Sequence, residues 1–299
     1  MPSRCLVTGG CGFIGSHLVD RLVNAGHEVH VVDNLSSKYN EENNYHPLAI
    51  YIIQDILDVT EPMMRDVDYV FHLAAESRIP ECLENPELAV KTNVQGTCHL
   101  LNLAKQSGVK KFLFSSTSSV YGNDNPIPAL EYFKKDCLNP YSITKSTGED
   151  FCKMYFDLYG LETIIFRYFN VYGEGQPTKG QYAPVVGLFQ KQHAEGKPMT
   201  VVGDGKQTRD YVHVSDVVEA NILAMDANNC GGEVFNIGCT KRYSVLDLAQ
   251  MVGGEDADIK FLPPRDGEAR HTSACTLKAK ESLNWEPKVN LNNWIKESK

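Results

Sequence analysis

The chain of 299 residues lacks the features that mark several large classes of protein. It has no apolar run close to the roughly 20 residues that a helix needs to cross a bilayer, so no membrane segment is expected. Its formal net charge of −9 argues against negatively charged partners, both nucleic acids and acidic membranes. It has no Cys-x-x-Cys and no His-x-x-x-His pair, so no metal site is expected.

The cysteines also lack the pattern of a disulfide framework. Their number, nine, is odd, and their spacing is irregular. No signal-peptide pattern comes before the first strand-like run. We therefore expect reduced, mostly buried thiols and a cytoplasmic protein.

What the sequence does contain begins with a glycine-rich turn. Arg4 to Thr8 reads as a short buried strand, and Gly9-Gly10-Cys11-Gly12-Phe13-Ile14-Gly15 leads from it into a helix-like segment. Glycines at 9, 12 and 15 suit a tight turn, close approach of the backbone to a phosphate, and close packing of helix on strand. The amino terminus of the helix would then face a pyrophosphate.

The second strand-like run indicates which dinucleotide is bound. It covers Glu28 to Val32 and is followed by Asp33, eighteen residues after Gly15. A carboxylate at this place accepts hydrogen bonds from both ribose hydroxyls and repels a 2′-phosphate. Since no arginine follows directly, the sequence predicts NAD rather than NADP.

Strand-like and helix-like segments alternate over the first part of the chain. Apolar runs at 48–53, 69–73, 111–114 and 162–167 are separated by other segments, two of which, 86–107 and 141–159, have the signals of helices. This alternation predicts an α/β fold with a Rossmann-type doubly wound parallel sheet. Its ligands would lie beyond the carboxyl ends of the strands.

The alternation loosens after residue 173, where glycine and proline become frequent. Short helices are expected near 184–194, 215–225 and 245–251. We therefore expect an NAD-binding domain over residues 1–173 and a smaller, mixed C-terminal substrate lobe over 174–299. Elements of the two lobes are expected to interleave.

Tyr141 and Lys145 are four residues apart, so both side chains share one face if the segment is helical. A free tyrosine has a pKa near ~10 and is a poor base at neutral pH. A nearby ammonium group and a second positive charge favour the phenolate. A pKa near 7 needs about 4 kcal/mol, which two cations in a partly buried site can supply. Taken alone, the pair is far more often part of a solvated helix face, and only the other motifs of the chain favour a catalytic role.

Taken in order, the motifs resemble those of the extended short-chain dehydrogenase/reductases, and most closely the nucleotide-sugar 4-epimerases that act on UDP-glucose or UDP-N-acetylglucosamine. The resemblance covers nearly the whole chain. The motifs that carry it are Gly9 to Gly15, His72-Leu73-Ala74-Ala75, Asn93, Ser115-Ser116, Tyr141-x-x-x-Lys145, Arg167-Tyr168-Phe169-Asn170 and Leu283-Asn284-Trp285-Glu286-Pro287.

The resemblance implies a set of ligand-binding positions. Those for NAD are Gly9, Gly12, Phe13, Ile14, Gly15, Asp33, Asn34, Asp55, Ile56, Leu73, Ala74, Ala75, Asn93, Ser115, Tyr141, Lys145 and Phe169. Those for a small-molecule nucleotide-sugar are Thr117, Tyr141, Asn170, Arg209, Arg265 and Thr272.

Particular roles follow from the resemblance. Tyr141 is the base, Lys145 bonds the nicotinamide ribose, and Thr117 bonds the 4-hydroxyl of the sugar. Arg209 and Arg265 clamp the diphosphate, since arginine offers a planar fork of donors for phosphate oxygens. They also supply the local positive charge that an anionic ligand needs on a chain of net charge −9.

The implied reaction is NAD-dependent 4-epimerisation of a UDP-sugar through a 4-keto intermediate. Related 4,6-dehydratases place a carboxylate pair where this chain has Ser118-Ser119, so dehydration is not expected. A decarboxylase of a nucleotide-linked uronic acid stays open, because it uses the same oxidation, although no arginine partner for a C5 carboxylate is evident. A non-catalytic NAD-binding sensor is the remaining alternative, disfavoured by the intact tyrosine and lysine.

Two further expectations rest on the same resemblance. Thr272 stands where related epimerases have a bulky tyrosine, so we expect room for an N-acetyl group on the sugar. A homodimer is expected, formed through the helical segment 86–107 and the Tyr141 helix.

Overall fold

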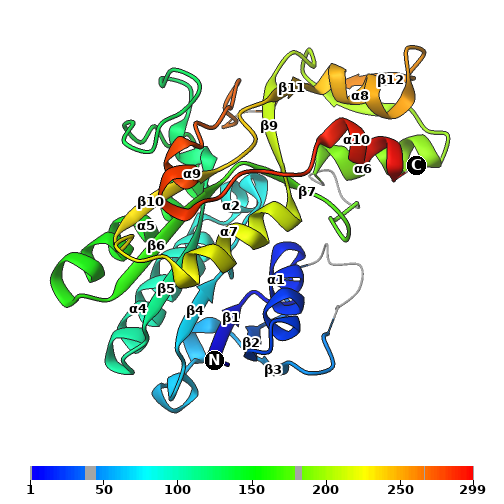
Figure 1. Ribbon diagram of the computed structural model, residues 1–299. Helices are drawn as coiled ribbons and strands as arrows, with labels where there is room; N and C mark the ends of the chain where they lie inside the picture. Colours follow the sequence, from blue (N-terminus) through cyan, green and yellow to red (C-terminus); the bar gives the residue numbers. More distant parts are fainter. Residues whose placement is uncertain (1, 38–44, 179–183, 266, 299) are drawn as a thin grey trace.

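A seven-stranded sheet runs through the computed structural model, which describes residues 2–37, 45–178, 184–265 and 267–298 (Figure 1). The order is β10-β6-β5-β4-β1-β2-β3, and every neighbouring pair is parallel. The strands are β1 (Arg4–Thr8), β2 (Glu28–Asp33), β3 (Ile50–Ile53), β4 (Tyr69–His72), β5 (Lys111–Thr117), β6 (Glu162–Tyr168) and β10 (Glu233–Ile237). Strand addition reverses direction between β1 and β4, which makes their carboxyl ends the topological switch point.

Helices cover both faces of this sheet, as the alternation in the sequence predicts. One face carries α1 (Phe13–Asn24), α7 (Val214–Asp226) and α9 (Leu277–Leu283), whose apolar side chains join the core with those of the strands. Leu18 and Leu22, one turn apart on α1, are fully buried there. The other face carries α4 (Thr97–Gln106) and α5 (Pro140–Tyr159). The prediction of a Rossmann-type doubly wound sheet is confirmed.

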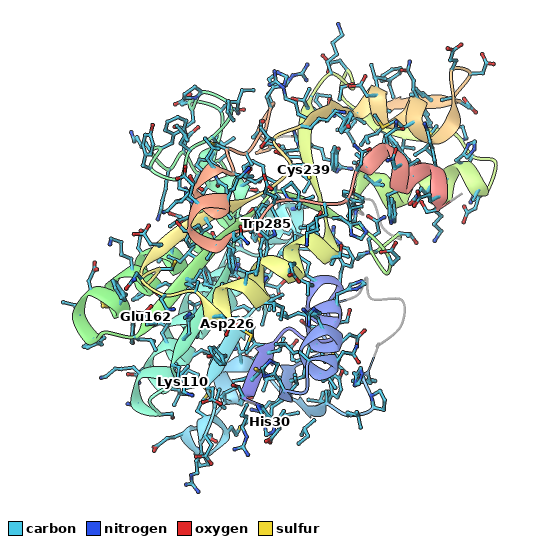
Figure 2. All side chains as sticks on the ribbon, viewed as in Figure 1. His30, Lys110, Glu162, Asp226, Cys239 and Trp285 are labelled. Carbon is cyan, nitrogen blue, oxygen red and sulfur yellow. The ribbon has the colours of Figure 1, made fainter. Side chains whose placement is uncertain are left out.

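The carboxyl ends of all seven strands point toward the smaller lobe. In Figure 2, Lys110 and Glu162, at the starts of β5 and β6, lie at the lower end of the molecule. Cys239, which follows β10, lies at the upper end. Residues that follow the strands are therefore gathered between the sheet and the smaller lobe, where a ligand of such a fold binds.

The smaller lobe contains two short sheets. One has the order β11 (Arg242–Ser244), β9 (Thr208–His213), β7 (Asn170–Tyr172), and the other pairs β12 (Ile259–Leu262) with β8 (Met199–Val202). Helices α6 (Val185–Ala194), α8 (Val245–Gly253) and α10 (Leu291–Glu297) pack with them around a separate apolar cluster. Strand β10 and helices α7 and α9 come after residue 173 but pack with the large sheet, so elements of the two lobes alternate along the chain. The domain boundary at residue 173 stays a prediction.

The segment 86–107, expected as one helix, is divided. It consists of α3 (Pro86–Ala89), a π-helical stretch η3 (Val90–Gly96) and α4. The wider π turn contains Asn93, whose side chain bonds both the backbone of Glu76 and the hydroxyl of Thr144. The sequence also gave no expectation of α2 (Ile79–Glu84), α9, α10 or the 3₁₀ turns η1 (Ile56–Asp58), η2 (Glu61–Met64) and η4 (Ser118–Tyr121).

The nine cysteines are free thiols, five of them buried and four partly buried. Within the described ranges, no helix combines the length and the apolar character needed to cross a membrane. In the same ranges, no three His, Cys, Asp or Glu side chains gather as a metal site would require.

Candidate active site

The glycine turn between β1 and α1 is shaped by the absence of side chains. Gly9 has a φ of +72°, and a Cβ added there would lie 2.7 Å from the backbone nitrogen of Ala74. A Cβ on Gly15 would collide with the carbonyl oxygen of Gly9. The turn and the first turn of α1 therefore pack backbone against backbone, which leaves the helix amino terminus open to a phosphate.

Asp33 ends β2, as the sequence predicts, and it also fixes the neighbouring loops. Its Oδ2 accepts a hydrogen bond from the backbone nitrogen of Cys11 at 3.0 Å, and its Oδ1 accepts from that of Leu35 at 2.8 Å. Asn34, the next residue, donates to Asp55 at 3.2 Å. The positions assigned to the adenosine end of NAD thus lie together, with Ile56 buried beside them.

The positions assigned to the nicotinamide end follow β4, β5 and β6. Leu73 donates its backbone N–H to Thr8, which keeps Ala74 and Ala75 directly beyond the end of β4. Ser115 is buried within β5 and donates to the hydroxyl of Tyr168 at 3.3 Å. Phe169 is 4% exposed in a small apolar cluster beyond β6.

Asn93, assigned to the path to the nicotinamide, is held by three hydrogen bonds. Its amide oxygen accepts from the backbone nitrogen of Glu76 at 2.8 Å, and its amide nitrogen donates to Thr144 and to Glu76, both at 2.9 Å. With 1% exposure it ties the loop after β4 to helix α5. Its place beside the nicotinamide stays a prediction.

Helix α5 brings Tyr141 and Lys145 to the ends of the strands. It begins with a capping box, in which the side chain of Asn139 accepts from Ser142, and it ends at Gly160 in the left-handed conformation. The ammonium group of Lys145 lies 4.3 Å from the centre of the Phe114 ring. Lys145 is only 2% exposed, and burial lowers its pKa to about 8.

The surroundings of Tyr141 do not favour its phenolate. Burial raises its pKa to about 12, while a hydrogen bond with Thr117 and the positive charge of Arg78 act in the opposite direction. Without a ligand in the cleft, these groups favour the protonated hydroxyl of Tyr141 at neutral pH.

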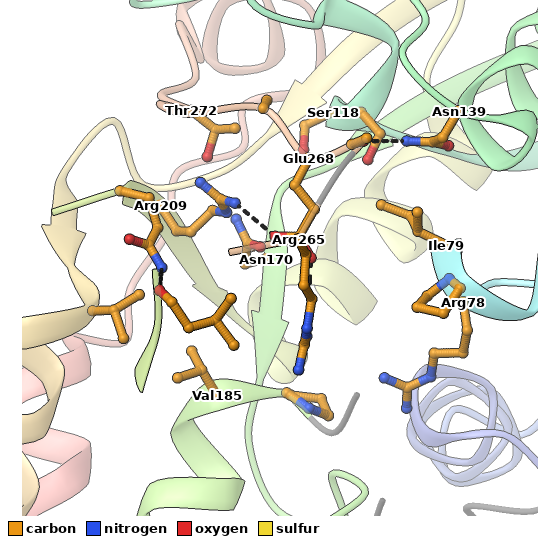
Figure 3. Close-up of a pocket in the computed structure, with 18 of the residues that line it drawn as sticks. Arg78, Ile79, Ser118, Asn139, Asn170, Val185, Arg209, Arg265, Glu268 and Thr272 are labelled. Atoms are coloured by element: carbon orange, nitrogen blue, oxygen red, sulfur yellow. Dashed lines mark hydrogen bonds and ion pairs between the residues drawn. The ribbon is translucent and has the colours of Figure 1, made fainter. Parts of the chain in front are cut away.

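A cleft of about 320 Å³ lies between the ends of the strands and the smaller lobe. Four of the six residues assigned to the nucleotide-sugar line it: Asn170, Arg209, Arg265 and Thr272. The other two, Thr117 and Tyr141, are not among the lining residues. Ser118, Ser119 and Asn139 also line it (Figure 3). The first two follow Thr117 and the third precedes Tyr141 by two residues, so the cleft reaches the neighbourhood of the assigned base.

The arginines of the cleft share a carboxylate. Arg209 donates to Oε2 of Glu268 at 3.1 Å, and Nη1 of Arg265 lies 4.0 Å from Oε1 of the same residue (Figure 3). Backbone carbonyls of Thr208 and Arg270 hold the other arm of the Arg209 guanidinium. Two guanidinium groups directed at one anionic group form a geometry that also suits a diphosphate.

Sequence reasoning missed several polar residues of the cleft, among them Arg78, Gln207, Tyr211 and Glu268. Glu268 follows Arg265 by three residues, and Gln207 and Tyr211 flank Arg209 by two, so the arginine motifs themselves were the available signal. Arg78 had no comparable signal, because it lies in an element that the sequence did not predict.

Residues 5–238 match the NAD dependent epimerase/dehydratase family, and the chain belongs to that family. Because its fold and glycine turn are those of the family, it is an enzyme of this group that uses NAD.

Three relatives show how wide the group is. A UDP-glucose 4-epimerase of Thermotoga maritima, solved with UDP-glucose, is 40% identical, with a TM-score of 0.91 and coverage of 98% of this chain and 96% of that one. A UDP-glucuronic acid 4-epimerase of Bacillus cereus, solved with UDP-glucuronic acid and NAD, is 32% identical, with a TM-score of 0.89 and coverage of 99% and 100%. UDP-glucuronic acid decarboxylase 1 of Arabidopsis thaliana is 39% identical, with coverage of 96% and 67%.

Proposed function

We propose that the chain catalyses the NAD-dependent 4-epimerisation of a UDP-sugar, interconverting UDP-glucose with UDP-galactose or UDP-N-acetylglucosamine with UDP-N-acetylgalactosamine through a 4-keto intermediate. The observation that carries the proposal is the cleft of about 320 Å³. A pair of arginines suited to a diphosphate lines it together with Ser118 and Asn139, which are close in the chain to Thr117 and Tyr141. Relatives that are UDP-sugar 4-epimerases support it further.

NAD, when bound, accepts the hydride from C4 of the sugar and later returns it. Gly9 and Gly15 fit this cofactor because a Cβ on either would fill the close backbone packing of the turn. Asp33, held at the end of β2, suits the adenosine ribose. Lys145, a buried residue of α5, suits the nicotinamide ribose.

Tyr141 takes the proton from the 4-hydroxyl as the C4–H bond is broken, and gives it back when the keto group is reduced. Thr117, which already bonds Tyr141, orients the 4-hydroxyl toward it. Arg209 and Arg265 exchange Glu268 for the diphosphate and keep the nucleotide fixed. Once the 4-hydroxyl has become a keto group, the sugar is held mainly through the diphosphate, and its turning would present either face of C4.

A second reaction, decarboxylation of a nucleotide-linked uronic acid, is favoured by the plant relative that carries it out. It shares the oxidation at C4 and therefore needs the same Tyr141. It differs afterwards, because loss of CO₂ from C5 leaves a pentose instead of a 4-epimer. The product is what distinguishes the two reactions.

The first experiment is an incubation of the purified protein with UDP-glucose or UDP-N-acetylglucosamine, without added cofactor, followed by NMR. We expect signals of the 4-epimer to appear in both cases. A mixture that stays unchanged even after NAD is added would contradict the proposal, provided the same preparation has its fold intact by circular dichroism.

We also propose that two copies of the chain form a homodimer through α5 and the helices next to it. The side chains of Leu83, Leu88, Val90 and Ile143 on α2, α3, η3 and α5 are large, apolar and 41–53% exposed. An apolar surface of this kind suits an isologous helix–helix interface. Light scattering after gel filtration should give twice the chain mass of 33.3 kDa for the wild type and one chain mass for Ile143→Glu.

A further inference from the structure

His72 is a buried titratable residue to which the proposed function gives no task. It ends β4, and its register partner on β1 is Thr8, the residue before the glycine turn. The imidazole is 1% exposed, and both of its nitrogens have hydrogen-bond partners. Nδ1 lies 2.7 Å from the hydroxyl of Thr8, and Nε2 lies 2.9 Å from the hydroxyl of Thr97. His72 therefore joins the strand that leads to the glycine turn with the start of α4.

The partners of His72 determine which nitrogen holds the proton. The hydroxyl of Thr97 donates its single proton to the backbone carbonyl of Asn93 at 2.7 Å, so it can only accept from His72. Nε2 is therefore the protonated nitrogen. Burial, with a smaller effect from the positive charge of Lys145, lowers the pKa of His72 to about 3, so the ring is neutral. Nδ1 is then an acceptor for the hydroxyl of Thr8.

The hydrogen bonds continue in the same direction to helix α5. Asn93, in the π turn, donates from its side-chain amide to the hydroxyl of Thr144 at 2.9 Å. Thr144 in turn donates to the backbone carbonyl of Tyr141 at 2.9 Å. This series of hydrogen bonds, called the buried network below, has five members, all of them buried: Thr8, His72, Thr97, Asn93 and Thr144.

The two ends of the buried network lie at the two parts of the site that have to act together. Thr8 precedes Gly9, and its hydroxyl also accepts a long hydrogen bond from the backbone nitrogen of Ala74 at 3.4 Å. Gly9 and Ala74 are both assigned to NAD, whereas the other end of the network is the backbone of Tyr141, the assigned base. Hydride and proton leave the same carbon and its hydroxyl, so the spacing between cofactor and base has to be held closely.

We propose that His72 is a positioning residue, which as a neutral imidazole protonated on Nε2 fixes helix α5, and with it Tyr141, relative to the bound NAD. This inference rests on the proposed function, because it takes Tyr141 as the group that exchanges the proton with the sugar. His72 is not among the residues that line the cleft, so it acts through the other members of the network. A leucine would fill similar space and would leave the hydroxyls of Thr8 and Thr97 without this partner.

The protonation of His72 can be tested directly on the wild-type protein with NAD bound. NMR of protein with isotope-labelled histidine nitrogens distinguishes a protonated from an unprotonated ring nitrogen. The signals of His72 are those that disappear in His72→Gln. We expect a proton on Nε2 and none on Nδ1 at neutral pH. A doubly protonated ring, or a proton on Nδ1 alone, would overturn the inference.

The positioning role is tested by comparing His72→Leu with His72→Gln in the formation of the 4-epimer. His72→Leu should lower kcat by about 10- to 100-fold, the effect of a small misplacement at a reacting centre. KM for UDP-glucose should stay within about 2-fold, because Arg209 and Arg265 belong to the smaller lobe. Glutamine offers one acceptor and a donor in place of the ring nitrogens, so His72→Gln should recover most of kcat. Equal kcat values for the two variants would contradict the inference.

Two further variants keep the test decisive if His72→Leu does not fold. Thr97→Val removes the hydroxyl that accepts from His72 and should lower kcat in the same way, so a kcat close to the wild type would overturn the inference. The matched control is His99→Leu on the same helix. Nε2 of His99 bonds the backbone carbonyl of Val59 at 2.8 Å, outside the buried network, so its loss should change kcat by less than about 2-fold.

A measurement without turnover separates this inference from the proposed function. In NAD-bound protein labelled at Cζ of its tyrosines, the NMR signal of Tyr141, identified by its loss in Tyr141→Phe, should move in His72→Leu and stay near the wild-type position in His72→Gln. If the wild type forms no 4-epimer but this pattern is found, the proposed function fails and the inference stands. If the wild type forms the 4-epimer and His72→Leu keeps both the kcat and the Tyr141 signal of the wild type, the inference fails and the proposed function stands.

Discussion

The glycine turn and the cleft are built in different ways. The turn is formed by backbone atoms: Gly9 and Gly15 allow its segments to pack closely, and Asp33 accepts a hydrogen bond from the backbone of Cys11. The cleft is lined by side chains from segments as far apart in the chain as Arg78 and Thr272. The first arrangement suits a ligand that never varies, and the second suits a group of enzymes whose sugars differ.

The two regions also attract anions in different ways, one through backbone groups and the other through side chains. The anion-binding capacity of the turn comes from backbone N–H groups and the dipole of α1, which no single substitution removes. In the cleft it comes from Arg209 and Arg265, which Glu268 balances. Single substitutions in the cleft should therefore change substrate use strongly and cofactor binding little.

The largest effect is expected for Tyr141→Phe, which belongs to neither region. Removing the hydroxyl removes the group that exchanges the proton with the sugar, and general acid–base catalysis contributes about 10²- to 10⁴-fold to such reactions. NMR of epimer formation under saturating substrate gives the measurement. Binding of NAD and of UDP should be unchanged, and a variant that keeps more than about a tenth of the turnover would refute the assignment.

Lys145→Met should lower turnover and yet stabilise the fold. Burial lowers the Lys145 pKa from 10.5 to about 8, so the charged form costs about 3 kcal/mol in the folded state at pH 7. The unfolded chain holds this proton up to a higher pH, so the stability of the wild type rises between pH 8 and 10.5. The advantage of the methionine variant should be full below pH 8 and vanish as the pH approaches 10.5.

Urea unfolding of both proteins at pH 7 and pH 9.5 measures this difference. The matched control is Lys153→Met on the same helix, where the lysine is 63% exposed and paired with Asp157. That substitution should change the free energy of unfolding by less than about 1 kcal/mol at either pH. A Lys145→Met protein that is less stable than the wild type at pH 7 would show that burying the charged ammonium group does not destabilise the fold.

Arg209→Gln tests the contrast between turn and cleft directly. The substitution removes a charge-assisted contact from the proposed diphosphate and should raise KM for a UDP-sugar by about 10- to 100-fold. The affinity for NAD, measured by fluorescence titration, should stay within about 2-fold, because the turn depends on backbone groups. Arg242→Gln, an exposed arginine on the neighbouring strand β11, serves as the control. A parallel loss of NAD affinity would mean that the two regions are coupled.

The same contrast explains what could be read from the sequence. The central strand segments, the helix that carries Tyr141 and Lys145, and the place of Asp33 depend on local periodicity and on residues close in the chain. The π turn at Asn93 could not be foreseen, because the partners that use its side chain, Glu76 and Thr144, come from other elements.

The cleft divides along the same line. Arg209 and Arg265 lie in recognisable motifs, so resemblance was enough to assign them. Arg78 is brought to the cleft by the packing of α2 on α5, which no local pattern encodes. The burial that raises the Tyr141 pKa could not be read from the sequence for a related reason, since it depends on how several elements pack together.

The smallest effect is expected for Thr272→Tyr, which changes the shape of the cleft without changing its charge. Thr272 lines the cleft, and its hydroxyl accepts a weak hydrogen bond from the backbone nitrogen of Asp210 at 3.4 Å. A tyrosine would extend a ring into space that an N-acetyl group needs, and overpacking of this kind costs about 1–3 kcal/mol. The value of kcat/KM for UDP-N-acetylglucosamine should therefore fall by about 10- to 100-fold, and that for UDP-glucose by less than about 3-fold.

Thr272→Ser, which keeps the hydroxyl and removes only a methyl group, should leave both values near those of the wild type. The two substrates are best assayed in one mixture, so that the ratio of their 4-epimers is read from a single NMR spectrum. If Thr272→Tyr leaves the ratio unchanged, the 2-substituent does not lie against this wall. The sugar would then have to be turned so that a different substituent meets Thr272.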